Sequence, residues 1–328
     1  MRPFAYSSPG DVAEAIASGG ETGAKFLGGG TNLLDLMKMG VENPAHLIAI
    51  GRLPLAGIEE KADGIRIGAM AKNSEVAAHP LVAQRYPLLS QALLSGASPQ
   101  IRNMATVGGN LLQRTRCFYF YDPSYKECNK RSPGSGCAAI HGYNRIHAIL
   151  GASDRCIATN PSDMAVALTA LDARIIVRGA QRERSIPIHA FYRLPGDTPE
   201  IENELRPGEL ITAVELPPQP AGRRSYYLKV RDRNSFAFAL VSVAAMVEMG
   251  DNNRMREARI ALGGVAHKPW RVAEAEEILR GREPGEAVFQ QAAAILLKGS
   301  KPHRYNGFKV ELARRATVRA LLSASENG

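Results

Sequence analysis

Two glycine-rich segments of this 328-residue chain have the composition of turns that bind a diphosphate. The first is Phe26-Leu27-Gly28-Gly29-Gly30-Thr31-Asn32-Leu33-Leu34, and it joins a predicted strand to a predicted helix. Three consecutive glycines let backbone N–H groups converge on an anion, and Thr31 and Asn32 add side-chain donors. The start of the following helix adds the positive end of its dipole. Taken alone, such a segment is as typical of a tight turn as of a ligand site.

A second segment, Thr106-Val107-Gly108-Gly109-Asn110, repeats the same chemistry later in the chain. Neither segment has the spacing of the dinucleotide fingerprint of a doubly wound sheet, and neither matches a P-loop. Two turns built from small, hydroxyl-bearing and amide-bearing residues can hold one extended diphosphate from both sides. We therefore predict that Lys25 to Leu34 and Thr106 to Asn110 form the two halves of one cradle.

All four cysteines of the chain lie in one short window, at Cys117, Cys128, Cys137 and Cys156. Cysteines that only fill a core are scattered, so this confinement indicates a shared ligand or disulfides. No pair has the C-x2-C spacing of common zinc sites, and the spacing also differs from the ferredoxin patterns. From spacing alone, an iron–sulfur cluster, a zinc ion, two disulfides and unrelated thiols all remain open.

No other constellation in the sequence indicates a reaction. The seven histidines, which include His141 and His147, form no ligand-spaced cluster, and we interpret them as surface or structural residues. No acid–base pair and no nucleophile–histidine arrangement is present either. We therefore predict no catalytic residue on this chain.

The elements that must position these residues alternate in type at the start of the chain. The first 50 residues predict a strand, a helix, a strand, the glycine loop, a helix and a strand. Asp63-Gly64 predicts a hairpin over 57–70. A long helical stretch is predicted over 73–94, a second helix over 161–171, and another hairpin near Gly179.

Three prolines and a glycine in 217–222 predict a domain boundary, because they interrupt any regular element. Beyond this boundary, three strands are predicted, over 225–230, 240–249 and 258–265. Three helices follow, starting near Trp270, Gly285 and Gly307. Strands followed by helices indicate a small α+β domain over 222–328.

Composition excludes several classes of protein. The formal net charge is +9, but the basic residues form no unbroken stripe with interleaved aromatic residues, so we predict no nucleic-acid binding. No apolar run approaches the roughly 18 residues that span a bilayer, so no membrane insertion is expected. The N-terminal residues lack an apolar core, which predicts no signal peptide on this chain.

The two glycine segments together resemble the FAD-binding subunit of the xanthine dehydrogenase / carbon monoxide dehydrogenase family of molybdenum hydroxylases. The resemblance covers essentially the whole chain, including Pro161-Ser162-Asp163-Met164-Ala165 and Pro207-Gly208-Glu209-Leu210-Ile211. The segments around Cys117 and between Cys128 and Cys137 are most similar to the flavin subunit of three-subunit periplasmic aldehyde oxidoreductases, which carries an additional iron–sulfur cluster.

The resemblance implies an α+β fold, with a two-subdomain FAD-binding domain of the vanillyl-alcohol-oxidase type over 1–218. Its subdomains would cover about 1–55 and 56–218, and an insertion over 115–158 would carry the four cysteines. Lys25 to Leu34 would wrap the FAD pyrophosphate, and Thr106, Gly108, Gly109 and Asn110 would complete the cradle. Asp163 would bind sugar-alcohol or ribose hydroxyls of FAD; a helix N-cap is the alternative for this residue, and the two roles are compatible. Ile211 and Lys229 would border the isoalloxazine or the adenine.

The narrower resemblance implies a [4Fe–4S] cluster on Cys117, Cys128, Cys137 and Cys156. It also implies a molybdenum-binding large subunit and a [2Fe–2S] small subunit as partners, and electron transfer from these subunits to an external acceptor. Periplasmic export would then depend on a partner that carries a signal. Tyr119 and Tyr121 fit either shielding of a flavin ring or anchoring of the insertion.

Two other functions fit parts of the sequence. A stand-alone FAD oxidase would use the same cradle, but the C-terminal residues form too short a domain for its substrate site. A structural module held together by zinc or disulfides would explain the cysteines but not the glycine turns.

Overall fold

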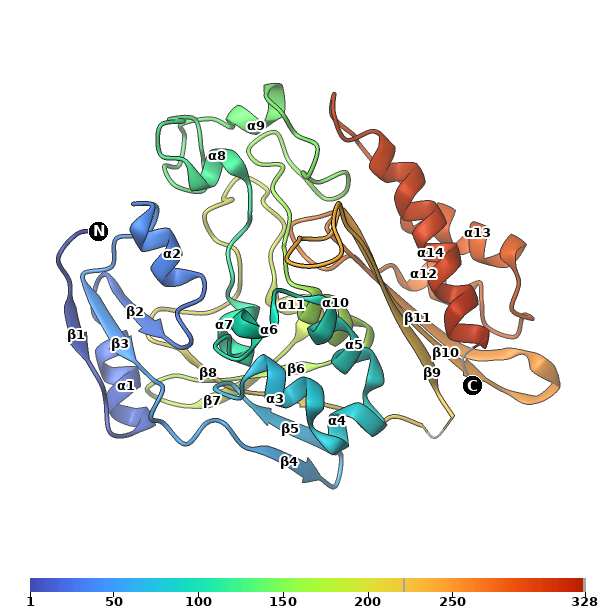
Figure 1. Ribbon diagram of the computed structural model, residues 1–328, viewed down its shortest axis with the longest axis horizontal. Helices are drawn as coiled ribbons and strands as arrows, with labels where there is room; N and C mark the ends of the chain where they lie inside the picture. Colours follow the sequence, from blue (N-terminus) through green and yellow to red (C-terminus); the bar gives the residue numbers. More distant parts are fainter. Residues whose placement is uncertain (221, 327–328) are drawn as a thin grey trace.

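The computed structural model describes residues 1–220 and 222–326, which form three sheets flanked by helices (Figure 1). The first sheet is parallel, in the order β1-β3-β2. Its elements are β1 (Ala5–Ser7), α1 (Val12–Gly19), β2 (Ala24–Leu27), α2 (Leu33–Lys38) and β3 (His46–Ala49). The predicted alternation over the first 50 residues is confirmed.

The second sheet is antiparallel, with five strands in the order β4-β5-β8-β6-β7. Its strands are β4 (Ile58–Lys61), β5 (Gly64–Gly68), β6 (Arg174–Arg178), β7 (Glu183–Pro187) and β8 (Leu210–Leu216). The hairpins predicted at Asp63-Gly64 and near Gly179 are both present, as β4-β5 and β6-β7.

The single helix predicted over 73–94 is wrong, because the chain forms three short helices there. They are α3 (Asn73–Ala78), α4 (Pro80–Arg85) and α5 (Pro87–Ser95). Pro80 and Pro87 each occupy the first position of a helix, where their missing N–H costs nothing but where the preceding helix must end. The other helices of this domain are α6 (Pro99–Arg102), α7 (Val107–Leu111), α10 (Asp163–Ala170) and α11 (Ile188–Phe191).

The cysteine-bearing insertion contains little regular structure. Its helices are α8 (Phe118–Tyr121) and α9 (Ala138–His141), drawn in green at the top of Figure 1. The insertion packs on α2, where Leu36 shares a buried cluster with Tyr119, Phe120 and three of the cysteines. The insertion therefore lies beside the glycine loop that precedes α2.

The C-terminal part forms the third sheet, antiparallel in the order β11-β10-β9. Its elements are β9 (Arg224–Val230), β10 (Val241–Met249), the short 3-10 helix η1 (Asp251–Asn253), β11 (Met255–Gly263), α12 (Ala273–Glu277), α13 (Glu286–Leu296) and α14 (Phe308–Glu326). One face of the sheet packs on these three α-helices and the other on α5 and α10 (Figure 1). The predicted α+β class, with a three-stranded sheet and helices at the end, is confirmed.

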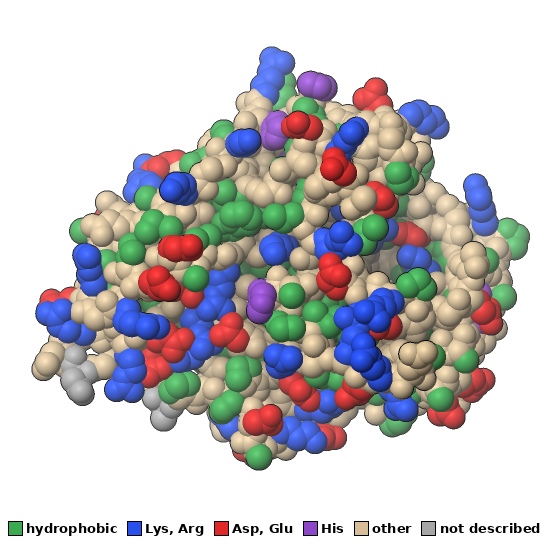
Figure 2. Space-filling view, turned by 180° about the vertical axis from the view of Figure 1, so that it is seen from behind, with side chains coloured by type: hydrophobic (Ala, Val, Ile, Leu, Met, Phe, Trp, Pro, Cys, Tyr) green, Lys and Arg blue, Asp and Glu red, His purple; other side chains and the backbone are tan. Residues whose placement is uncertain are grey.

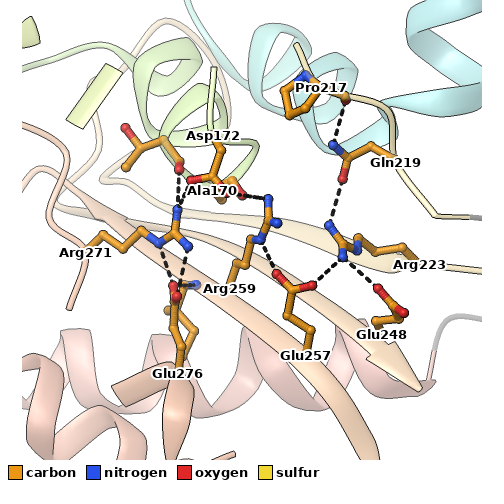
Figure 3. A network of polar contacts seen from close by, with 12 residues as sticks. Ala170, Asp172, Pro217, Gln219, Arg223, Glu248, Glu257, Arg259, Arg271 and Glu276 are labelled. Carbon is orange, nitrogen blue, oxygen red and sulfur yellow. Dashed lines mark hydrogen bonds and ion pairs between the residues drawn. The ribbon is translucent and has the colours of Figure 1, made fainter. Parts of the chain in front are cut away.

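A chain of ion pairs joins the C-terminal sheet to the rest of the protein (Figure 3). Asp172, just after α10, accepts from Arg259 at 2.7 Å and from Arg271 at 2.5 Å. Arg223 bridges Glu248 and Glu257, at 2.6 and 2.7 Å. Because the two Asp172 pairs join the end of α10 to the C-terminal part, they help to fix the position of the third sheet.

Side chains at and just before the start of α14 form hydrogen bonds to the backbone of the insertion near His147. The buried Lys309 ammonium donates to the carbonyl oxygens of His147 and Gly264, at 2.9 and 2.5 Å. The Asn306 amide donates to the carbonyls of His147 and Ala148, both at 3.2 Å. These bonds position the backbone around His147.

The surface carries Lys, Arg, Asp and Glu side chains interspersed over the face shown in Figure 2, with no continuous basic stripe there. Within the described residues, no helix has the length and apolar character needed to cross a membrane.

Candidate functional site

The two glycine turns lie against each other. A Cβ atom on Gly29 would stand 1.9 Å from the carbonyl oxygen of Met104, and one on Gly28 would stand 3.0 Å from the Thr106 hydroxyl. The Thr106 side chain in turn caps α7 by accepting from the Gly109 N–H at 3.2 Å. Only a chain without side chains at positions 28 and 29 permits this contact. The structure thus brings together the two segments that the sequence predicted to form one cradle.

A cavity of about 810 Å³ opens beside the turns, at the junction of the N-terminal part, the insertion and the C-terminal sheet. This volume lies in the range of small-molecule and cofactor sites. Predicted residues that line it are Thr31, Asn32, Gly109, Asn110 and Asp163. The C-terminal domain contributes the loop between β9 and β10, which carries Phe236 and Phe238, and the end of β11 at Gly263.

The other predicted residues of the first segment support the turn from outside. The Lys25 side chain is half exposed and pairs with Glu42 at 3.5 Å. The Phe26 ring covers Gly19 of α1. Gly30 has a φ of +73°, a conformation that favours glycine, and it approaches the Leu34 side chain in the first turn of α2.

Asn32 occupies the N-cap position of α2 but its side chain does not cap the helix. Its oxygen accepts from the backbone N–H of Arg114 at 2.8 Å, and its amide donates to the Tyr121 hydroxyl at 2.9 Å. The glycine turn is therefore tied to the insertion through Asn32.

The N-cap interpretation of Asp163 is wrong, because Ser162 caps α10 by accepting from the Ala165 N–H at 2.9 Å. Asp163 is instead buried, and it accepts from the Lys229 ammonium and the Tyr227 hydroxyl, both at 2.7 Å. Burial and the neighbouring Asp163 charge raise the pKa of Tyr227, so the phenol stays protonated and donates. Lys229 does not line the cavity but neutralises the carboxylate that does.

Ile211 is buried in β8 within the main hydrophobic core and does not line the cavity. Its predicted place at the border of the flavin therefore requires a contact through other side chains and stays a prediction.

Replacing Lys229 with Met is expected to destabilise the protein by about 3 kcal/mol, because the Asp163 carboxylate would remain buried without its counter-ion. The double variant Lys229→Met/Asp163→Leu removes both charges and is expected to recover most of this loss. Chemical denaturation of the variants without any bound ligand measures both values. A single variant as stable as the wild type would show that the pair contributes nothing.

The cavity lining carries excess positive charge. Among the described residues, the cavity arginines Arg102, Arg116 and Arg233 have no carboxylate within ion-pair distance. Asp163 pairs with Lys229 and Asp232 pairs with Arg145, at 2.7 Å each. Only the Asp35 carboxylate remains to offset the three guanidinium groups, so the cavity attracts an anionic ligand.

The four cysteines form one largely buried group within the insertion. Cys128 and Cys137 face each other in an antiparallel bridge, and Cys137 precedes α9. Cys117 precedes α8, and Cys156 bridges to Ser153. All four are free thiols, so the structure contains neither of the disulfides considered from the spacing.

Backbone N–H groups surround these sulfurs. Those of Tyr119 and Phe120 approach Cys117, and those of Ala139, Ile140 and Ile157 approach Cys137. Such donors stabilise thiolates and the sulfurs of a metal cluster.

Burial and hydrogen bonding set the charge that the thiols carry. Burial raises the pKa of Cys117 to about 12. A hydrogen bond from the Cys156 thiol lowers the pKa of Cys137 to about 6, and the same bond raises that of Cys156. One cysteine of the group, Cys137, therefore loses its proton readily. Deprotonation of the other buried cysteines requires the positive charge of a bound metal centre.

His147 is buried beside Cys117, and its Nε2 lies 3.1 Å from the sulfur. Burial lowers the pKa of His147 to about 4, so the ring is neutral at neutral pH and carries one proton. The ring and the thiol share a hydrogen bond at this distance, and which of the two donates depends on the ring tautomer. The interpretation of His147 as structural missed this contact, because no spacing rule relates it to Cys117.

Family comparisons agree with this geometry. Residues 2–219 match the FAD binding domain in molybdopterin dehydrogenase, and residues 226–324 match the CO dehydrogenase flavoprotein C-terminal domain. The chain is 50% identical over 327 residues to the aldehyde oxidoreductase FAD-binding subunit PaoB of Escherichia coli K12, covering 99% of both chains. It is 28% identical to the carbon monoxide dehydrogenase medium chain of Hydrogenophaga pseudoflava, covering 98% of this chain and 96% of that one.

A solved structure has the same fold. The carbon monoxide dehydrogenase of Hydrogenophaga pseudoflava aligns with a TM-score of 0.77 and 27% identity, covering 99% of this chain and 98% of that chain.

Proposed function

Since this chain belongs to the family of FAD-binding subunits of molybdenum hydroxylases, we propose that it is the electron-transfer subunit of an aldehyde oxidoreductase complex. In this proposal it holds FAD in the cavity and a [4Fe–4S] cluster on its four cysteines. A molybdenum-binding large subunit oxidises the aldehyde, and a [2Fe–2S] small subunit relays the electrons to this chain. An external acceptor then receives them.

The observation that carries the proposal is that one short segment serves both sites. Cys117 belongs to the cysteine group, and its neighbours Arg116, Phe118 and Tyr121 line the cavity. Two redox centres held at the two sides of one helical turn are close enough for direct electron transfer. A structural zinc or disulfide module gives no reason for such proximity to a flavin cavity.

The cysteine group supplies the ligands that a [4Fe–4S] cluster needs. Its four free thiols pack in one cluster of the insertion, and in such a metal cluster each cysteine binds a different iron atom. The backbone N–H groups near Cys117 and Cys137 would offset the charge of the bound cluster. Among residues 1–220 and 222–326, no group of three His, Cys, Asp or Glu side chains is arranged to hold a single metal ion.

When bound, FAD would be able to transfer either one or two electrons, and the cluster would transfer one electron at a time. The glycine turns would hold the pyrophosphate, and the Asp163 carboxylate would accept hydrogen bonds from hydroxyls of FAD. The Lys229 ammonium pairs with the Asp163 carboxylate and balances its charge. With its proton on Nε2, the His147 ring would donate a hydrogen bond to the Cys117 sulfur and so stabilise a thiolate there.

The proposal predicts that aldehyde reduces the FAD of this chain only inside the complex. Stopped-flow absorbance under anaerobic conditions should show flavin bleaching in the complex and none in the isolated FAD-loaded chain. Turnover of substrate by the isolated chain would instead establish a stand-alone oxidase. We also propose that the complex is exported to the periplasm with a signal-bearing partner, which fractionation of cells that express all subunits tests.

A further inference from the structure

The insertion that carries the cysteines also contributes side chains to the FAD cavity. Arg116 and Tyr121 both line the cavity: Arg116 directly precedes Cys117, and Tyr121 is the last residue of α8. Neither residue belongs to the two glycine turns. The insertion therefore has contacts toward the flavin site that its role as a cluster-binding segment does not require.

Arg116 reaches the cavity without a direct ion pair, and the only carboxylate among the causes of its pKa shift is Asp35 of the same lining. Its guanidinium donates to the Arg114 carbonyl at 2.9 Å, to the Tyr121 hydroxyl at 2.6 Å and to the Gln113 side chain at 3.4 Å. All three acceptors are neutral, and no carboxylate of the described residues lies within ion-pair distance. The Phe238 ring, whose centre is 4.9 Å from the guanidinium carbon, covers it further. A partly desolvated cation of this kind is stabilised by an anion.

The Tyr121 hydroxyl has its own hydrogen free to donate. Its oxygen accepts from the Arg116 guanidinium at 2.6 Å and from the Asn32 amide at 2.9 Å. Two accepted bonds occupy both lone pairs of a phenol. No acceptor for the phenol hydrogen is present among the described residues, so it is available to a ligand in the cavity.

Both donors lie at the first glycine turn, because Asn32 belongs to it. We propose that Arg116 and Tyr121 bind the pyrophosphate of FAD, so that the cysteine-bearing insertion completes the cradle formed by the two glycine turns. The inference rests on the FAD cavity of the proposed function. It gives the insertion a second role, independent of its metal.

The test uses the complex from which FAD has been removed, titrated with FAD and followed by flavin fluorescence. Arg116→Gln is expected to raise the Kd for FAD at least about tenfold, and Tyr121→Phe about threefold, since charge-assisted bonds exceed neutral ones. Arg116→Lys keeps the charge but loses the paired N–H donors of the guanidinium group, so its Kd for FAD should lie between those of Arg116→Gln and the wild type. The control is Arg155→Gln, an exposed arginine elsewhere in the insertion, which should bind FAD as the wild type does.

Two further measurements on Arg116→Gln exclude other roles. The melting temperature of the FAD-free complex and the midpoint potential of bound FAD should both match the wild type. An unchanged Kd overturns the inference. A lower melting temperature of the FAD-free Arg116→Gln complex also overturns it, because Arg116 would then stabilise the insertion rather than bind FAD. A shifted potential at unchanged Kd would place Arg116 at the isoalloxazine and also overturns it. Absence of FAD from the wild-type complex would instead contradict the proposed function.

Discussion

Gly29→Ala is expected to remove most of the FAD from the purified complex. The added Cβ would stand 1.9 Å from the Met104 carbonyl oxygen and 2.7 Å from its carbon, so backbone would have to move rather than a flexible side chain. Met104 leads directly into Thr106 and the second glycine turn, so the two halves of the cradle would separate. Overpacking of this kind costs about 3 kcal/mol, which corresponds to a loss of affinity of roughly a hundredfold.

Flavin released by denaturing the purified complex measures this loss, together with the Kd of the FAD-free form. Gly51→Ala is the matched control, because a Cβ there would meet no atom within 4 Å and Gly51 has no left-handed φ. The control should retain FAD fully. If Gly29→Ala binds FAD as tightly as Gly51→Ala does, the two turns do not form the cradle.

Cys137→Ser is expected to abolish the cluster while FAD still binds. Cys137 is the sulfur at which the backbone N–H groups of Ala139, Ile140 and Ile157 converge, and serine binds iron far more weakly. The glycine turns and α10 lie outside the insertion, so the cradle they form remains. Iron bound to this chain should fall from about four atoms to nearly none, because the cluster needs all four thiolates.

Iron analysis and EPR of the reduced complex measure this change against Ser132→Ala, an exposed serine of the same insertion that should keep its iron. Zinc in the wild-type complex, without iron beyond that of the partner subunits, would contradict the assignment. So would iron that survives in Cys137→Ser.

Much of the fold could be predicted from local sequence signals. The glycine turn between β2 and α2, the hairpin at Asp63-Gly64 and the final three strands follow from residues adjacent in the chain. The helix predicted over 73–94 failed because apolar periodicity continues across Pro80 and Pro87, while the backbone cannot.

The sequence predicted that the two glycine turns meet, because each is a contiguous motif, but it did not indicate contacts that depend on long-range packing. The glycine turns were identified because glycine and small polar residues follow one another. The role proposed for Arg116 depends on its contact with Tyr121, which in turn contacts Asn32. The role proposed for His147 depends on its contact with Cys117. Sequence spacing does not encode either contact. The only signal for Arg116 in the sequence was its position directly before Cys117, a candidate metal ligand.

The central claim is that this chain carries both FAD and a [4Fe–4S] cluster in one electron path. An anaerobic redox titration of the intact complex, followed by EPR and visible absorbance, tests it most directly. We predict one flavin per copy of this chain, and a cluster signal distinct from those of the [2Fe–2S] partner that disappears in Cys137→Ser. A complex with flavin but no such additional signal, or with the signal unchanged in Cys137→Ser, would contradict the claim.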